Sequence, residues 1–274
     1  MCAGRRMSPS WLKSSRTVPK AGPIARGGGN ELLEERLDPT TIRRIERLEL
    51  APGARCLELG AGRGSIARWL CGHVGQRGHV TATDIDIDWL AELSLPNLRV
   101  LCHDLRTDDF PERSFDLIHA RAVLMHLGER MATLRRMVSW LAPGGWLLVE
   151  DGDFGMWMGD ADPLWAARPR AWQEAFPNGS LGQGRALLRQ ISRLGLERIG
   201  AEGELDIVQP GTPLGEFYRL SLAATAKPAV AAGGLTADEV AQLVARFDQP
   251  DFLACGFAYI GAWGRRSRDP APQN

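Results

Sequence analysis

A glycine-rich loop near residue 60 is the part of the sequence best suited to chemistry. The apolar segment Cys56-Leu57-Glu58-Leu59 leads into Gly60-Ala61-Gly62-Arg63-Gly64, and the spacing predicts a helix that begins near Ser65. A loop between a strand and a helix can offer backbone amides and the helix N-terminus to a ligand. The order strand, glycine loop, helix therefore indicates a nucleotide site.

The spacing of the glycines restricts the ligand. A dinucleotide fingerprint needs glycine at its first, third and sixth positions, but here Gly60 and Gly62 are followed by Ser65 at the sixth. The carboxylate of Glu58 would repel a pyrophosphate, whereas it would attract an ammonium or sulfonium group in a partly dry site. We therefore expect a ligand that carries positive charge and lacks phosphate.

A second acid follows the loop at an informative distance. The apolar run 79–84 reads as a buried strand that ends in Asp84, about twenty residues after the glycines. An acid at the end of the neighbouring parallel strand can accept hydrogen bonds from both hydroxyls of a ribose. Asp84 is the predicted ribose ligand, with Asp86 and Asp88 as alternatives that a solvated turn would also explain.

The segments that follow must position these residues. Apolar runs at 98–101, 115–121 and 146–150 read as strands, and Met131, Leu134, Val138 and Leu141 recur at helical spacing between the last two. Alternation of strand and helix predicts a parallel sheet with helices on both faces, and ligands bind at the carboxyl ends of such strands.

Five motifs in order give the chain a resemblance to a known family. The motifs are, in order, Glu58 with Gly60, Gly62 and Gly64; Asp84; Asp104; a strand opened by Asp116 with His126-Leu127 beyond it; and Leu141 to Leu147 with Pro143-Gly144-Gly145. In this respect residues 50–150 resemble the class I S-adenosylmethionine-dependent methyltransferases.

The resemblance implies a fold and a cofactor. The expected fold is α/β, a Rossmann-like, doubly wound, seven-stranded sheet with helices on both faces, a helical cap, and the last strand antiparallel between strands five and six. The expected cofactor is S-adenosyl-L-methionine, with Asp104 and the amide of Leu105 at the adenine. The residues expected to bind it are Glu58, Gly60, Ala61, Gly62, Asp84, Ile85, Asp104, Leu105, Ala120 and Arg121.

Methyl transfer requires alignment, desolvation and, for some acceptor atoms, a base. His126, just beyond the fourth predicted strand, is the candidate catalytic base, because a histidine titrates in the useful range. His119 and Tyr218 are the next candidates. A histidine that packs or touches the cofactor without moving a proton is the alternative for His126.

Aromatic residues and methionines are dense after the fifth predicted strand. They include Trp157, Trp165 and Trp172, and Phe217 and Tyr218 follow in a later helical segment. These side chains predict an apolar pocket for a small molecule, plausible for a secondary metabolite, although a packed core would use the same residues. Magnesium held by Glu150, Asp151 and Asp153 is a weaker alternative, so we expect no metal.

Composition excludes several partners. The 274 residues contain 33 basic and 33 acidic side chains, so no overall charge draws the chain to nucleic acid or to a membrane surface. Five scattered cysteines without a CxxC pair indicate a reducing compartment, and no run of 18 apolar residues occurs. We expect a cytoplasmic protein that binds neither nucleic acid nor membrane, and a homodimer stays open.

The chain divides into two parts. Residues 1–30 are predicted to be a flexible basic arm, and residues 31–274 one domain with two N-terminal helices, the second starting at Asp38-Pro39, and a helical insert at about 210–250. Two other functions stay open: a fold member that binds the cofactor without methyl transfer, as a cyclase or a regulatory module, and a protein or RNA methyltransferase.

Overall fold

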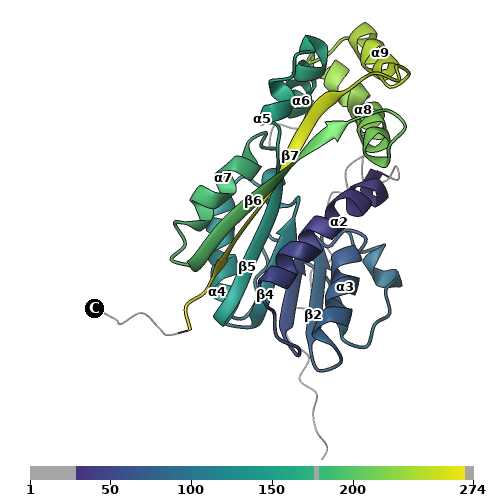
Figure 1. Ribbon diagram of the computed structural model, residues 1–274. Coiled ribbons are helices and arrows are strands. Elements are labelled where there is room, and N and C mark those ends of the chain that lie inside the picture. Colours follow the sequence, from purple (N-terminus) through teal and green to yellow (C-terminus); the bar gives the residue numbers. More distant parts are fainter. Residues whose placement is uncertain (1–28, 176–178, 269–274) are drawn as a thin grey trace, which may run out of the picture.

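The computed structural model describes residues 29–175 and 179–268, so residues 1–28 of the predicted arm lie outside the described part. One sheet of seven strands forms the centre, in the order β3-β2-β1-β4-β5-β7-β6. Strand β7 runs antiparallel to both β5 and β6, which confirms the predicted topology (Figure 1). The strands are β1 (Arg55–Leu59), β2 (His79–Asp84), β3 (Leu98–Cys102), β4 (Phe115–Arg121), β5 (Leu141–Asp153), β6 (Glu197–Val208) and β7 (Ala254–Arg265).

Helices cover both faces of this sheet, as predicted. Successive side chains of a strand point to opposite faces. Cys56 accordingly packs with residues of α3 (Ser65–Val74), and Leu57 packs in a separate cluster with residues of α4 (Arg130–Trp140) and α7 (Gln183–Ile191). Each face of β1 therefore has its own apolar core.

A helical cap lies beyond the carboxyl ends of the strands, where β6 and β7 extend upward in Figure 1. It consists of α5 (Gly155–Met158), α6 (Pro163–Ala175), α8 (Pro213–Ala231) and α9 (Ala237–Arg246). Trp157, Trp165 and Tyr218 are buried at its centre. The predicted insert at 210–250 corresponds to α8 and α9, and α5 and α6 complete the cap.

The N-terminal segment is a single helix. Helix α2 runs from Gly29 to Arg47 with Pro39 inside it, so the prediction of two helices is wrong. A proline within a helix removes one hydrogen bond, but side chains on both sides of Pro39 are held by one partner. Arg36, Thr40 and Arg43 all bond to Glu204 of β6. Between β2 and β3 the strict alternation of strand and helix also fails, since one 3-10 turn, Leu90–Glu92, stands in place of a helix.

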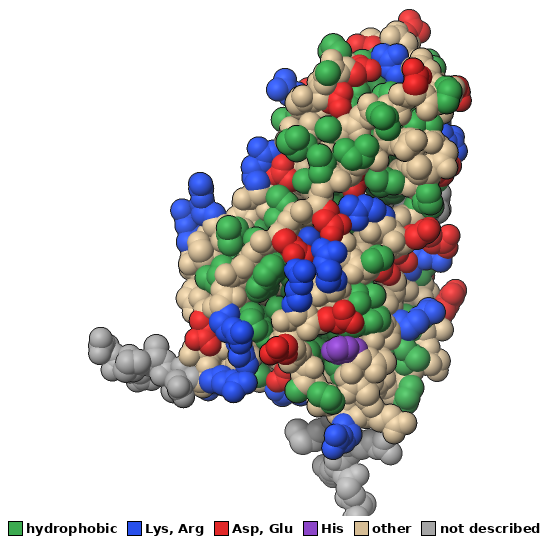
Figure 2. Space-filling view, in the orientation of Figure 1, with side chains coloured by type: hydrophobic (Ala, Val, Ile, Leu, Met, Phe, Trp, Pro, Cys, Tyr) green, Lys and Arg blue, Asp and Glu red, His purple; other side chains and the backbone are tan. Residues whose placement is uncertain are grey.

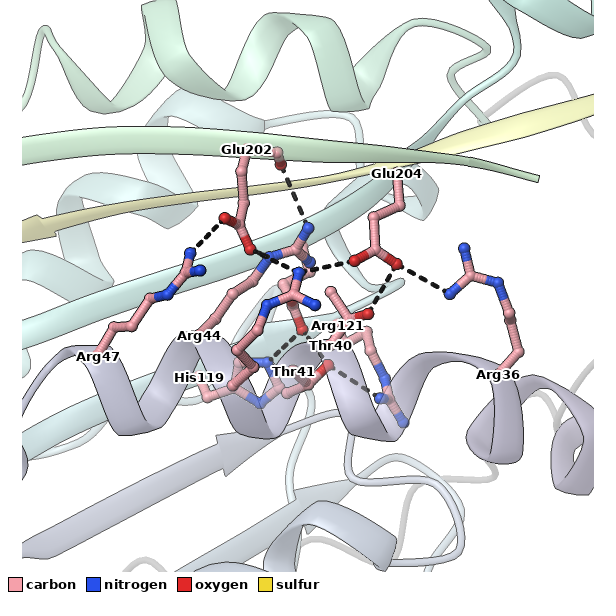
Figure 3. A network of polar contacts seen from close by, with 11 residues as sticks. Arg36, Thr40, Thr41, Arg44, Arg47, His119, Arg121, Glu202 and Glu204 are labelled. Carbon is pink, nitrogen blue, oxygen red and sulfur yellow. Dashed lines mark hydrogen bonds and ion pairs between the residues drawn. The ribbon is translucent and has the colours of Figure 1, made fainter.

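Helix α2 is fastened to the sheet by ion pairs (Figure 3). Arg44, which is buried, pairs with Glu150 of β5 and bonds through Nε to Glu202 of β6 at 3.0 Å. Gly261 of β7 is the register partner of both carboxylates. A Cβ at Gly261 would come within 2.9 Å of the Arg44 side chain, so the glycine leaves the space through which one arginine reaches both acids.

The molecular surface agrees with the balanced composition. On the face shown in Figure 2, basic and acidic side chains lie interspersed, and several of the basic ones belong to α2. Within the described ranges, no helix is long and apolar enough to cross a membrane.

Candidate cofactor and acceptor site

A cavity of about 850 Å³ lies at the carboxyl ends of β1, β2 and β4, beneath the cap. Its lining includes two groups of residues. The first surrounds the glycine loop and comprises Gly60, Ala61, Gly62, Arg63, Asp84, Ile85, Asp104, Leu105 and Arg121. The second comes from the cap and its surroundings and comprises His126, Phe154, Trp157, Arg168, Trp172, Phe217, Ser221, Thr225, Phe257 and Tyr259.

The conformation of the glycine loop explains its sequence. Gly60 and Gly62 have φ values of +67° and +56°, in the left-handed region that favours glycine. A Cβ at Gly60 would overlap the side chain of Val123, whereas one at Gly62 would meet no atom within 4 Å. Gly60 is therefore required by packing, and Gly62 leaves room for a ligand.

The amides of this loop are already engaged. The Gly62 amide donates to Oδ2 of Asp84 at 2.9 Å, and the Gly64 amide donates to the carbonyl of Ala61 at 2.8 Å. A phosphate-binding loop must keep such amides free for its anion. The loop therefore fits a ligand without phosphate, in line with the spacing of its glycines.

Asp84 is positioned as a hydrogen-bond acceptor. Burial raises the pKa of this carboxyl, and the hydrogen bonds from the amides of Gly62 and Asp86 oppose the rise. With its backbone partners fixed and its side chain on the cavity wall, Asp84 can accept hydrogen bonds from ribose hydroxyls. The loop and Asp84 together fit the nucleoside part of S-adenosylmethionine.

The predicted adenine residues lie on the same wall. The side-chain hydrogen bond from Arg106 lowers the pKa of Asp104 and holds the carboxylate, with Nη2 to Oδ2 at 2.7 Å. His103, which sequence reasoning missed, also lines the cavity. Its ring stacks on Phe110 at 4.6 Å, and neither ring nitrogen has a hydrogen-bond partner within the described residues.

Two expected cofactor residues lie elsewhere. Neither Glu58 nor Ala120 is among the residues that line the cavity. Glu58 is the register partner of His119, and its Oε2 lies 2.7 Å from His119 Nδ1 in the buried network beneath α2. The expected attraction between Glu58 and a charged ligand is therefore replaced by an internal ion pair.

Of the three candidate bases, His126 alone borders the cavity. The His126 side chain is exposed, yet partial desolvation of its ring and the nearby Arg130 lower its pKa, so the neutral ring predominates near pH 7. His119 is fully buried between two carboxylates, and Tyr218 is buried with its hydroxyl 3.1 Å from Asp206. His119 and Tyr218 are thus structural residues.

The three acids considered for magnesium do not form a site together. Glu150 belongs to the ion network of α2, Asp153 pairs with Arg185, and Asp151 is fully buried. Across the described residues, no group of three His, Cys, Asp or Glu side chains is placed to hold a metal ion.

Arg168 is the principal lining residue that the sequence analysis did not identify. It lies on α6 between Trp165 and Trp172, three and four residues away, so the three side chains share one side of the helix. A single charged residue among aromatic residues at helical spacing is the sequence signal that could have indicated it.

Fold and site together define the class: an α/β protein in which a glycine loop and a strand-end acid border a cavity that continues between aromatic residues of a helical cap. Residues 33–199, more than half of the chain, match the family model described as a methyltransferase domain. The chain therefore belongs to the class I S-adenosylmethionine-dependent methyltransferases, and S-adenosylmethionine is its cofactor.

Individual relatives match in part. The chain is 34% identical to methyltransferase str3 of Strobilurus tenacellus over 113 residues, which are 40% of each protein. It is 27% identical to phosphoethanolamine N-methyltransferase 1 of Arabidopsis thaliana over 118 residues, 41% of this chain and 24% of that protein. The chain thus spans less than half the length of both curated relatives.

A solved structure shares the fold. Phosphoethanolamine N-methyltransferase 2 of Haemonchus contortus, in complex with phosphomonomethylethanolamine and S-adenosylhomocysteine, superposes with a TM-score of 0.56 at 15% identity. The match covers 84% of this chain and 52% of that one.

Proposed function

We propose that this protein transfers the methyl group of S-adenosylmethionine to a small molecule that binds in the aromatic part of the cavity. The observation that carries the proposal is the continuity of the cavity, since one space is lined both by the glycine loop with Asp84 and by the aromatic cap. The relatives named for phosphoethanolamine methylation lend support, because their acceptor is a small molecule.

The cofactor supplies an electrophilic methyl group on a sulfonium, and the protein must align the acceptor in line with it. In this proposal Asp84 accepts from the ribose, Asp104 and the Leu105 amide hold the adenine, and the loop around Gly62 faces the rest of the cofactor. The aromatic residues of the cap exclude water from the acceptor, which strengthens the electrostatic interactions there.

His126 is the proposed base. It lines the cavity, and its lowered pKa leaves the ring neutral and able to accept a proton near pH 7. An acceptor atom that must lose a proton as it gains the methyl group would deliver that proton to a ring nitrogen of His126. A basic residue at this point is consistent with a nitrogen, oxygen or carbon acceptor.

The direct test uses S-adenosylmethionine with an isotopically labelled methyl group and a library of small molecules, read by mass spectrometry. Labelled product that forms with the native protein and not with Asp84→Asn would support the proposal. Binding of the cofactor without transfer to any acceptor would favour a cyclase or a regulatory protein, and labelled protein or RNA would favour a macromolecular substrate.

The cytoplasmic location, the role in secondary metabolism and the absence of nucleic-acid and membrane partners stay predictions from composition. The four described cysteines are free thiols, which supports a reducing compartment. Size-exclusion chromatography with light scattering will test the homodimer.

A further inference from the structure

Arg168 is a buried cation without an acidic partner. The residue is 4% exposed, and no ion pair joins it to an Asp or Glu within residues 29–175 and 179–268. Its Nη2 donates to two neutral hydroxyls of α8, Ser221 Oγ at 3.2 Å and Thr225 Oγ1 at 3.1 Å. Its Nε, also buried, has no hydrogen-bond partner in the described residues.

The surroundings of this guanidinium make it unusual. Its carbon Cζ lies 5.1 Å from the ring centre of Trp157, and Arg168 lines the cavity together with Trp172 and Phe217. Burial lowers the pKa of Arg168 to about 10, and the charged form still predominates at pH 7. An ionised group in such apolar surroundings is costly unless an opposite charge meets it.

By contrast, the cations near the glycine loop already have acidic partners. Arg121 pairs with Asp38 at 2.8 Å, and Arg63 pairs with Glu31. Arg168 is held by cap residues of α6, α8 and the segment at Trp157. Its unmatched charge therefore faces the part of the cavity that is left for the acceptor.

We propose that Arg168 is a specificity-determining residue that binds an oxyanion, a carboxylate or a phosphate ester, on the acceptor molecule. The acceptor would then have an anionic end at Arg168, a body between the aromatic rings and its methyl-accepting atom toward His126. That the bound molecule is a methyl acceptor rests on the proposed function, but the anion site itself can be tested by binding alone.

The first experiment titrates the full-length protein, saturated with S-adenosylhomocysteine, by calorimetry with three probes. Benzoate and phenyl phosphate carry the anion, and benzamide is the neutral match for benzoate. We expect at least one anion to bind about tenfold or more tightly than benzamide, which is the discrimination of a charged hydrogen bond. Equal affinities, or anions that bind more weakly than about 10 mM, would overturn the proposal.

The second experiment uses three variants. Arg168→Met should remove the preference for the anion, and Arg168→Lys should retain part of it. Arg170→Met is the matched control, since Arg170 lies two residues along the same helix and is exposed. Retention of the anion preference in Arg168→Met would contradict the proposal. If Arg168→Met fails to fold, the comparison of probes on the native protein still decides.

A carboxylate of the cofactor itself is the competing source of the anion. S-Adenosylhomocysteine has this group and 5′-methylthioadenosine lacks it. We expect Arg168→Met to leave the affinities for both unchanged; a loss confined to S-adenosylhomocysteine would assign Arg168 to the cofactor. Anion binding without methyl transfer would defeat the proposed function alone, and methyl transfer without preference for anions would defeat the anion site alone.

Discussion

Asp84 connects the glycine loop to the cavity, because it accepts from the Gly62 amide and still borders the space where a ribose would lie. Asp84→Asn keeps the size of the side chain but removes its charge. We expect the affinity for S-adenosylhomocysteine to fall by about 10- to 100-fold, which corresponds to the loss of charged hydrogen bonds. Calorimetric titration will measure this loss.

Asp88→Asn is the control for that substitution. Asp88 also lines the cavity but is exposed, and it has no bond to the loop in the described contacts. The affinity of Asp88→Asn for S-adenosylhomocysteine should stay within about threefold of the native value, as expected for a solvated charge. A similar loss in both variants would contradict the role of Asp84.

The proposed role of His126 predicts how the reaction rate depends on pH. Since partial desolvation and Arg130 lower the pKa of His126 from its ordinary value of 6.5, the ring becomes protonated mainly below that pH, and the rate should fall as the pH drops there. With an identified acceptor, His126→Asn should lower kcat by about 100-fold or more and abolish this acidic limb. An unchanged pH profile in the variant would show that His126 only packs.

At this scale, sequence and structure agree where neighbours in the chain decide the outcome. The placement of Gly60, Gly62 and Asp84 around one cavity could be predicted, because the loop and the strand end are local features. Glu58 was misplaced since its partner, His119, lies 61 residues away and only strand register brings the two together. The unmatched charge of Arg168 could not be known without the positions of all the acids.

Among the elements, β7 carries Gly261, whose lack of a side chain leaves space for Arg44 of the ion network. In Gly261→Ala the new methyl group would displace Arg44 from between Glu150 and Glu202. We expect the free energy of unfolding to fall by about 1–3 kcal/mol, the cost typical of overpacking. Urea denaturation will measure it.

Gly72→Ala is the matched substitution in α3. Gly72 is exposed, and a Cβ there would meet no atom within 4 Å. Because alanine favours a helix interior over glycine, this variant should be as stable as the native protein or more stable by up to about 1 kcal/mol. Equal destabilisation by both substitutions would contradict the role of Arg44 at β7.

Helix α2 shows where the prediction of elements from sequence reaches its limit. Asp38-Pro39 is a good local start signal for a helix, and signals of this kind correctly predicted α3, α4 and the strands β1 to β5. The continuity of α2 depends on Glu204, a residue more than 160 positions later. A local sequence pattern cannot indicate a contact between residues so far apart in the chain.

For the whole molecule, the charge on His119 links stability to pH. Burial alone would lower the pKa of His119, but Glu58 and Glu150 raise it to about 9. The folded state therefore binds a proton that the unfolded chain releases near pH 6.5. This stabilisation is complete below pH 6.5 and is lost as the pH rises toward 9. We expect the free energy of unfolding to decrease by roughly 3 kcal/mol over that range.

Urea denaturation at several pH values will measure that decrease, and the imidazole signal of His119 in NMR spectra will locate the titration. A midpoint near pH 6.5 for His119 would contradict the ion network at the centre of the sheet.

Ligand binding should also affect more than the cavity wall. Leu33 and Glu34 of α2 line the cavity, whereas no residue of α9 does. Saturation with S-adenosylhomocysteine should slow amide hydrogen exchange in residues 31–47 and leave residues 237–246 unchanged, because binding stabilises the elements that contact the ligand. Hydrogen exchange with mass spectrometry will test this, and equal protection of both helices would contradict it.

The fastening of α2 also has a consequence for synthesis on the ribosome. Among the described residues, α2 leaves the ribosome first, but the acids that pair with its arginines follow 106 to 170 residues later. Leu37 is buried among cap residues that are synthesised much later, whereas Ile45 packs with α3 and β1, which follow α2 directly. The C-terminal half of α2 can thus pack early on α3 and β1, but its ion pairs with the sheet and the burial of Leu37 must wait until the second half of the chain has been synthesised.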